Sequence, residues 1–165
     1  MRWVTLLVMH PNAQLLTDFY SAFASRDHAT MARSYSDAVR FSDPVFPDLD
    51  AEEVRAMWRM FCTGGSDIDV SFSGVEADDS TGRAHWEAVY SFPKTGRRVH
   101  NKIDASFDFA EGRIVRHSDK FDFYRWTRMA LGPVGTLMGW TPMVKNQVRA
   151  QARSQLKRFQ SEEKT

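Results

Sequence analysis

Two residues with acid/base side chains occupy positions where the sequence pattern predicts apolar residues. From Gly112 to Trp126 the chain reads as a strand that runs into a helix. Side chains two residues apart share one face of a strand. His117 and Asp119 therefore face the same side as their apolar neighbours, which are Val115, Phe121 and Phe123. An unpaired buried carboxylate is costly, so Asp119 is either paired, for example with an arginine, or a polar group in a cavity.

A second acid, Asp43, continues the apolar row of Val39 and Phe41 in a short strand expected over residues 37–44. Two acids in one apolar pocket acquire different pKa values, which leaves one as a base and the other as an acid near neutral pH. Such a pair can remove a proton next to a carbonyl group. In the structural alternative, Asp43 caps the turn before Pro44 and has no chemical role.

Other candidate residues surround this expected pair. His117 could orient Asp119 or relay a proton, or be a hydrogen-bonded core residue. Asn101 has the inward phase of its strand and could bind a substrate carbonyl or be a satisfied core amide. Several aromatic side chains are candidates for pocket walls, with plain core packing as the alternative: Trp58, Trp86, Tyr90, Phe121 and Trp126.

The elements that must position these residues follow from hydrophobic periodicity. Spacings of three and four residues predict helices, and alternation predicts strands. Helices are expected first, then an antiparallel meander with a bulge at Gly74, then helix again. This order indicates an α+β protein, with a curved antiparallel sheet packed on N-terminal helices. The expected helices cover residues 11–25, 27–35 and 51–63, and the meander begins at Ser66.

Two further segments complete the chain. Residues 129–143 are apolar but interrupted by Gly and Pro, which indicates a buried loop or short helical turns that close the pocket or cover an open end. Residues 144–160 predict an amphipathic helix with basic flanks. We expect its stripe to dock on the body or on a partner subunit, with contact to nucleic acid or an anionic membrane surface as the alternatives. The expected division is an N-terminal extension over 1–11, the α+β domain over 12–128 and this tail over 129–165.

Composition limits the class of function. The chain has 165 residues, a net charge of +1 and one cysteine, Cys62. This charge gives no global field for nucleic acid, so we expect no nucleic-acid partner. His85, His100 and His117 are expected on alternating faces, so we expect no metal site, and no cofactor-binding motif is found. The N-terminal apolar run lacks a signal-peptide cleavage site, and no segment is long enough for stable membrane insertion, so we expect a cytoplasmic protein.

Five motifs along the chain occur in an order and spacing found in a known family. They are F-Y-S-A-F-A-S-R-D in the first expected helix, F-S-D-P at residues 41–44, K-T-G-R at 94–97, F-D-F-A-E-G-R-I-V at 107–115 and R-H-S-D-K-F-D at 116–122. With these motifs, residues 12–126 resemble the SnoaL-like group of the nuclear transport factor 2-like superfamily, which includes polyketide cyclases, ketosteroid isomerases and limonene-epoxide hydrolases. The resemblance implies a cone-shaped α+β barrel with a deep ligand pocket, which often dimerises through the outer face of its sheet.

The resemblance assigns roles residue by residue. Asp119 matches the acid of the cyclases and the epoxide hydrolases, and Asp43 matches the general base of the isomerases. The isomerase oxyanion tyrosine falls on Phe19, so that donor is missing unless Tyr20 replaces it. Both residues count as candidate ligand contacts.

Two further assignments of family residues to positions in this chain are weaker. The second acid of the isomerases falls on Asp104 or, with a shifted alignment, on Ala105, and the alternation of the strand favours Ala105. The arginine and aspartate of the epoxide hydrolases fall on Trp86 and Ala88, which argues against epoxide hydrolysis by that mechanism.

The sequence therefore predicts a protein that binds an apolar small molecule with a carbonyl group. If it is an enzyme, it is a cofactor-independent isomerase, cyclase or dehydratase that uses Asp119, Asp43 and His117, and a homodimer is expected. The alternative is a non-catalytic ligand-binding or dimerisation module of the same fold.

Overall fold

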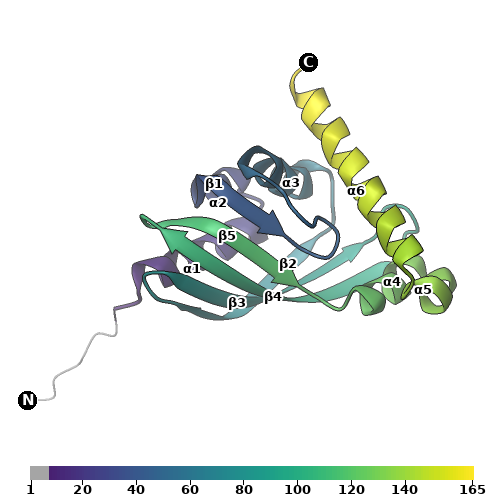
Figure 1. The fold of residues 1–165 in the computed structure, drawn as a ribbon, viewed down its shortest axis with the longest axis horizontal. Coiled ribbons are helices and arrows are strands. Elements are labelled where there is room, and N and C mark those ends of the chain that lie inside the picture. Colours follow the sequence, from purple (N-terminus) through teal and green to yellow (C-terminus); the bar gives the residue numbers. More distant parts are fainter. Residues whose placement is uncertain (1–7) are drawn as a thin grey trace, which may run out of the picture.

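The computed structural model describes residues 8–165, so the first part of the expected N-terminal extension lies outside the described residues (Figure 1). Five strands form one curved sheet in the order β1-β5-β4-β3-β2. Strands β2 to β5 pair antiparallel, as predicted, but β1 pairs parallel with β5. The strands are β1 (Tyr35–Ser42), β2 (Asp69–Ala77), β3 (Thr81–Ser91), β4 (Arg98–Ala110) and β5 (Arg113–Lys120).

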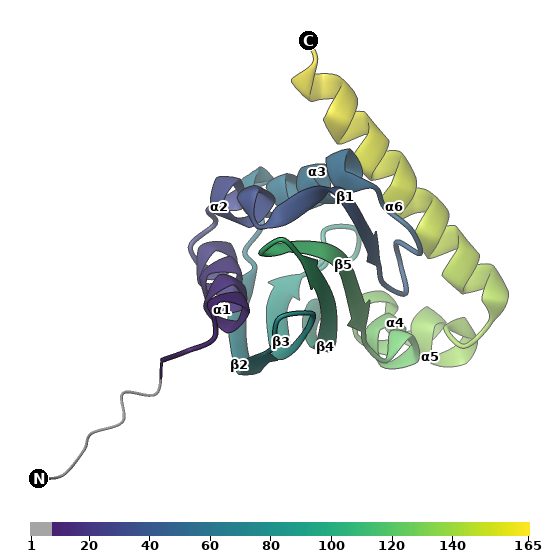
Figure 2. The ribbon, with the colours of Figure 1, turned by 60° about the vertical axis from the view of Figure 1, so that its left-hand side comes forward.

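Three helices cover one face of this sheet: α1 (Pro11–Ala24), α2 (His28–Arg33) and α3 (Ala51–Thr63) (Figure 2). The predicted α+β class is confirmed. α2 is shorter than expected, because the chain enters β1 at Tyr35. The acids before α3 form a capping box, in which Asp50 accepts from the Glu53 N–H and Glu53 accepts from the Asp50 N–H.

The strand pairing of the described residues has three irregularities, of which two bear on the predictions. Gly74 has a φ of 63° at the point where the pairing of β2 with β3 shifts, so the predicted bulge is confirmed. A second shift lies between β4 and β5, where Val115 is skipped by the pairing. The expectation that Val115 shares the inward face was therefore wrong. Ile114 is fully buried instead, while Val115 is only partly buried.

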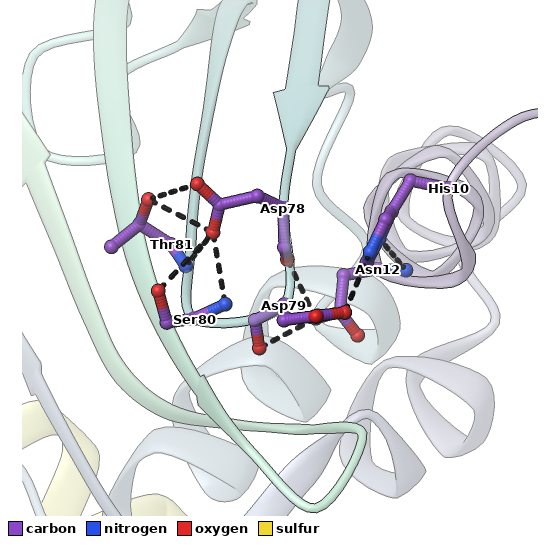
Figure 3. A network of polar contacts seen from close by, with 6 residues as sticks. All are labelled: His10, Asn12, Asp78, Asp79, Ser80 and Thr81. Atoms are coloured by element: carbon purple, nitrogen blue, oxygen red, sulfur yellow. Dashed lines mark hydrogen bonds and ion pairs between the residues drawn. The ribbon is translucent and has the colours of Figure 1, made fainter.

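The start of α1 is fixed to the turn between β2 and β3 (Figure 3). The Asn12 side-chain amide donates to the carbonyl oxygens of Asp78 and Asp79, at 2.9 and 3.3 Å. His10 caps the helix by accepting from the Asn12 N–H, and its other ring nitrogen lies 2.9 Å from Asp79 Oδ1. Asp78 orders the turn by accepting from the N–H groups of Ser80 and Thr81. These contacts hold α1 against the concave side of the sheet, where its aromatic residues enter the core.

The tail differs from the prediction for residues 129–143. These residues lie in the end of α4 (Phe123–Leu131), in α5 (Pro133–Met138) and in the start of α6 (Pro142–Glu163). The helical alternative is confirmed, but burial is not, because most of the large apolar side chains after Gly132 are exposed. α4 also continues across the boundary expected between residues 128 and 129. Among the described residues, none of the helices combines the length and apolar character required to cross a bilayer.

Helix α6 packs against α3 and crosses it at an angle, as Figures 1 and 2 show. Its stripe joins the main core through Leu156 and Ala152, so the expected docking on the body is confirmed. The Arg149 Nε–H donates to the Pro44 carbonyl at 2.9 Å, and Arg153 lies 2.9 Å from Glu53. α6 therefore covers the loop that follows β1.

The contact between α4 and α5 leaves no room for a side chain at Gly135. A Cβ atom there would lie 1.9 Å from the Thr127 carbonyl oxygen. We expect Gly135→Ala to separate the two helices and to lower the free energy of unfolding by about 1–3 kcal/mol. Urea unfolding measures this loss, with Gly112→Ala in the turn before β5 as the comparison. Cβ has open space at Gly112 and only a positive φ of 72° opposes it, so a smaller loss is expected there.

Candidate functional site

The register of β1 and β5 brings the two predicted acids to the same end of the sheet. Phe41 pairs with His117, and Ser42 pairs with Ser118. The next residues along the two parallel strands are Asp43 and Asp119. Asp119 is 4% exposed and His117 is fully buried, so both lie in the interior between the helices and the sheet.

A chain of hydrogen bonds connects α3 to Asp119. The Trp58 Nε1–H donates to Tyr35 Oη at 2.8 Å, and Tyr35 Oη lies 2.8 Å from His117 Nδ1. His117 Nε2 lies 2.9 Å from Asp119 Oδ1. The Trp86 Nε1–H also points at Asp119 Oδ1, at a longer 3.4 Å. The partner of Asp119 is thus a histidine, not the arginine that the structural alternative assumed.

The donors and acceptors of this chain fix its direction. An indole N–H can only donate, so Tyr35 Oη accepts from Trp58 and has its own hydrogen free for His117 Nδ1. His117 then carries its proton on Nε2 and donates it to Asp119. Every hydrogen is used once in this arrangement. Tyr35 was not among the predicted site residues, because no local pattern reveals a hydrogen-bond partner 82 residues away.

Aromatic rings surround the His117 imidazole. The Phe107 ring centroid lies 4.3 Å from that of His117, Phe41 lies at 5.0 Å, and Trp58 stacks at 6.1 Å. The predicted contact Phe19 is edge-on at 5.9 Å. This packing supports the interpretation of His117 as a satisfied core histidine, which holds Asp119 in place.

Asp43 has the structural role that the alternative predicted. Its Oδ1 accepts from the N–H groups of Val45 and Phe46, at 2.7 and 2.5 Å, and so orders the turn around Pro44. Burial nevertheless raises the pKa of Asp43 to about 7. The two N–H donors oppose this shift, and the negative charge of Asp119 adds to it. Asp43 therefore orders the turn and is also able to gain or lose a proton near neutral pH.

Tyr20 brings an unused donor into the same interior. It is fully buried on α1, and its hydroxyl has no hydrogen-bond partner among residues 8–165. Its ring stacks on Phe72 and lies 6.0 Å from Trp86, which contacts Asp119. Burial, followed by the charge of Asp119, holds the pKa of Tyr20 well above its usual value. The hydroxyl therefore keeps its proton, and buried groups without a partner are rare.

The remaining candidates lie further along the sheet. Asn101 is 7% exposed and pairs with Ala88 in the register of β3 with β4. No hydrogen bond joins its side chain to another residue in the described part of the chain. Tyr90 accepts from the Trp126 Nε1–H at 2.8 Å. Tyr90 and Phe121 contact both the main core and a second small cluster around Val99 and Trp126.

The outer face of the sheet carries two of the three histidines that were expected on alternating faces. His85 and His100 both contact Glu87, so that expectation was wrong for this pair. Asp104 also lies outward, 2.8 Å from His85, whereas its neighbour Ala105 is buried and pairs with Asp119. Across residues 8–165, no group of three or more His, Cys, Asp or Glu side chains is arranged to bind a metal ion.

Two surface depressions lie away from Asp119. The first, of about 480 Å³, is lined by charged residues at the start of α3, including Glu52 and Arg55. The second, of about 370 Å³, is lined by residues of β1 and β5, including Arg40 and Arg116. Neither of them includes a predicted catalytic or ligand-binding residue.

Comparison with known proteins agrees with this architecture. The model of the SnoaL-like domain matches residues 16–117, which is more than half of the chain. The match begins within α1 and ends within β5, so it contains Asp43 and His117 and stops two residues before Asp119. A search of curated proteins gave no significant match.

Solved structures share the fold at low sequence identity. An LEH-like epoxide hydrolase from M. tuberculosis is 18% identical, with a TM-score of 0.62 over 77% of this chain and 94% of that chain. IdmH from Streptomyces antibioticus, provisionally identified as a polyketide cyclase, is 18% identical, with a TM-score of 0.60 over 73% and 98%. TerC, co-crystallised with polyporic acid, is 15% identical, with a TM-score of 0.61 over 72% and 97%.

Proposed function

Because this chain belongs to the SnoaL-like domain family, we propose that it binds an apolar small molecule with a carbonyl group between its N-terminal helices and the concave face of its sheet. It acts there as a cofactor-independent isomerase, cyclase or dehydratase. The observation that carries this proposal is the pair of acids, Asp43 directly after β1 and Asp119 on the neighbouring strand β5, of which Asp43 has a pKa of about 7.

Asp119 is the proposed base. Its Oδ1 is occupied by His117 and Trp86, while no residue of the described chain donates to Oδ2. Oδ2 is therefore free to take a proton from the carbon next to a substrate carbonyl. His117 acts as a positioning residue, because it holds the carboxylate through Oδ1 and is itself fixed by Tyr35.

The developing negative charge on the substrate oxygen needs a donor. Tyr20 supplies one, since its buried hydroxyl keeps its proton and has no other partner among residues 8–165. Donors that are already in place stabilise such a charge without reorganisation. The Asn101 amide, further along the same face, is a second donor to the carbonyl end of a larger ligand. Near pH 7 the Asp43 carboxyl group is protonated in about half of the molecules, and it then returns a proton to the product.

Epoxide hydrolysis fits these residues less well. The arginine and aspartate that the resemblance requires are replaced by Trp86 and Ala88, both buried on β3. Trp86 contacts Asp119 as a neutral donor, so it cannot supply the positive charge of an arginine. The similarity to an epoxide hydrolase therefore supports the fold and not that reaction.

A second function is favoured by the packing of the interior. The rings of Phe107, Phe41 and Trp58 fill the space around His117, and Asp119 is almost completely buried. A module whose interior is filled by its own side chains would bind no substrate there. It would act instead as a non-catalytic module, dimerising through the outer face of the sheet.

Titration of the carboxyl groups by NMR tests the proposed function. We expect Asp43 to titrate near pH 7, as burial and the charge of Asp119 require. Asp119→Asn removes that charge and should shift the titration of Asp43 toward lower pH. Asp104→Asn is the matched control, since Asp104 precedes the partner of Asp119 on β4 but faces outward. That variant should leave the titration unchanged.

Ligand binding separates the two functions. Apolar molecules that co-purify with the protein are identified by mass spectrometry, and conversion of carbonyl compounds is then assayed with Asp119→Asn. Turnover that survives this substitution would contradict the assignment of Asp119 as the base. A protein that retains no apolar ligand, and in which Asp43 titrates near pH 4, would support the non-catalytic module.

A further inference from the structure

Among residues 8–165, the large apolar side chains that are exposed gather at one end of the molecule. The exceptions are Val8 and Met9. The other five lie within ten residues, on α5, in the turn that follows it and at the start of α6. Leu137 and Trp140 are the most exposed of the five, at 73% and 71%. We call this set the apolar patch: Val134, Leu137, Met138, Trp140 and Met143. Exposed large apolar side chains that gather in one region of a surface mark interaction sites.

Three cations border the apolar patch. Arg128 lies over the Tyr124 ring at 5.7 Å, and the Tyr124 hydroxyl donates to the Thr136 carbonyl in the middle of α5. Lys145 lies over the Phe123 ring at 5.6 Å, one residue after Val144 at the start of α6. Arg97 donates to the Met129 carbonyl, and a Cβ on Gly132 would lie 2.9 Å from its guanidinium. Within residues 8–165, none of these three cations has an acidic partner within 4.0 Å.

The charge of the surrounding segment has one sign, although the whole chain is close to neutral. Between Asp122 and Glu162 the sequence has seven cations and no acidic residue: Arg125, Arg128, Lys145, Arg149, Arg153, Lys157 and Arg158. The nearer acid, Asp122, caps the start of α4 through the Arg125 N–H, at the end of α4 away from α5. Exposed aromatic and aliphatic side chains with a basic border are typical of helices that lie in the surface of an anionic bilayer.

We propose that the apolar patch binds the surface of an anionic lipid bilayer. Trp140 and Leu137 enter the headgroup region, while Arg97, Arg128 and Lys145 contact anionic headgroups. The Trp140 Nε1–H donates to the Leu137 carbonyl, so its polar group is satisfied before the ring enters the lipid. The contact is peripheral and reversible, and it lies outside the interior that contains Asp119.

A second copy of the chain fits the apolar patch less well than a bilayer. A symmetric dimer places the same surface of each copy against the other. The cations that border one patch would then face those of its partner, and like charges that approach in this way repel. Anionic lipid headgroups neutralise them instead. The combination of a basic border and an apolar centre therefore favours lipid.

Vesicle flotation with the full chain tests this proposal. We expect the protein to float with phosphatidylcholine vesicles that contain phosphatidylglycerol and not with phosphatidylcholine alone, and raised salt should weaken the binding. Lys145→Glu should weaken it about tenfold, as a reversed charge near an anionic surface requires. Lys102→Glu is the matched control, because it makes the same change in net charge on the outer face of the sheet and should have less than about a twofold effect.

Two further variants test the contribution of the apolar side chains to vesicle binding. Leu137→Gln combined with Trp140→Ser should weaken vesicle binding by about tenfold or more. Trp140→Phe keeps an apolar ring and should retain binding. Absence of binding to either vesicle, equal binding to both, or an unchanged partition of the double variant would overturn the proposal. Sedimentation that shows a dimer dissociated by the double variant, or salt-sensitive binding to RNA in place of vesicles, would overturn it as well.

Discussion

Replacing His117 with alanine lowers the free energy of unfolding by about 3–5 kcal/mol. The substitution removes the donor that Asp119 Oδ1 accepts at 2.9 Å and the acceptor that Tyr35 uses at 2.8 Å. A buried carboxylate that loses its partner is left with the cost of its desolvation. The imidazole also fills space among aromatic rings, of which Phe107 is the nearest at 4.3 Å. A cavity there adds to the electrostatic loss.

Urea unfolding at neutral pH measures this effect. His100→Ala is the matched control, because His100 lies on the outer face of the sheet and contacts Glu87 in a partly exposed pair. Partly exposed ion pairs contribute little to stability, so His100→Ala should lower the free energy of unfolding by less than about 1 kcal/mol. Similar losses for the two variants would contradict the role assigned to His117.

A double variant distinguishes pairing from packing. His117→Leu combined with Asp119→Leu removes both members of the pair and keeps the interior filled. Removing both partners leaves no uncompensated charge, so the double variant should be more stable than His117→Leu alone. The two substitutions should therefore be non-additive by about 1–3 kcal/mol. Additive effects would show that His117 and Asp119 are not coupled.

Several properties of the site could be predicted from the order of residues alone. Strand periodicity placed His117, Asp119 and Asn101 inward, because alternation depends only on local backbone geometry. The same alternation predicted that Asp104 points outward and Ala105 inward, and in the structure Ala105 pairs with Asp119. The class of fold followed in the same way, from helices that precede a meander of alternating strands.

Other features depend on contacts between distant parts of the chain. The proximity of Asp43 to Asp119 results from parallel pairing of the first strand with the last, which no local pattern encodes. The bulge at Val115 shifted one inward position to Ile114. Residues 129–143 were expected to form a buried loop or short helical turns, but the large apolar side chains of 134–143 are exposed. Composition does not show whether a partner covers an apolar segment.

Asp43→Asn removes a pH dependence of stability that the wild-type protein should show between about pH 4 and pH 7. Asp43 has a folded pKa of about 7, above its unfolded value of 3.8. Between these values the folded state binds more protons than the unfolded state, so stability falls as the pH rises. The loss is complete above pH 7 and amounts to at most about 4 kcal/mol. Asparagine keeps the side-chain oxygen that accepts from Val45 and Phe46 but does not titrate.

Urea unfolding of both proteins at pH 4, 6 and 8 is therefore expected to show similar stability at the lowest pH and a growing advantage of Asp43→Asn as the pH rises. Asp27→Asn is the control of opposite sign. Hydrogen bonds from Thr30 lower the pKa of Asp27, so its contribution is present at neutral pH and is lost as the pH falls. That variant should be less stable than the wild type at pH 8. An Asp43→Asn variant with no advantage at pH 8 would mean that Asp43 ionises as an ordinary exposed carboxylate, and the acid/base role proposed for it would be lost.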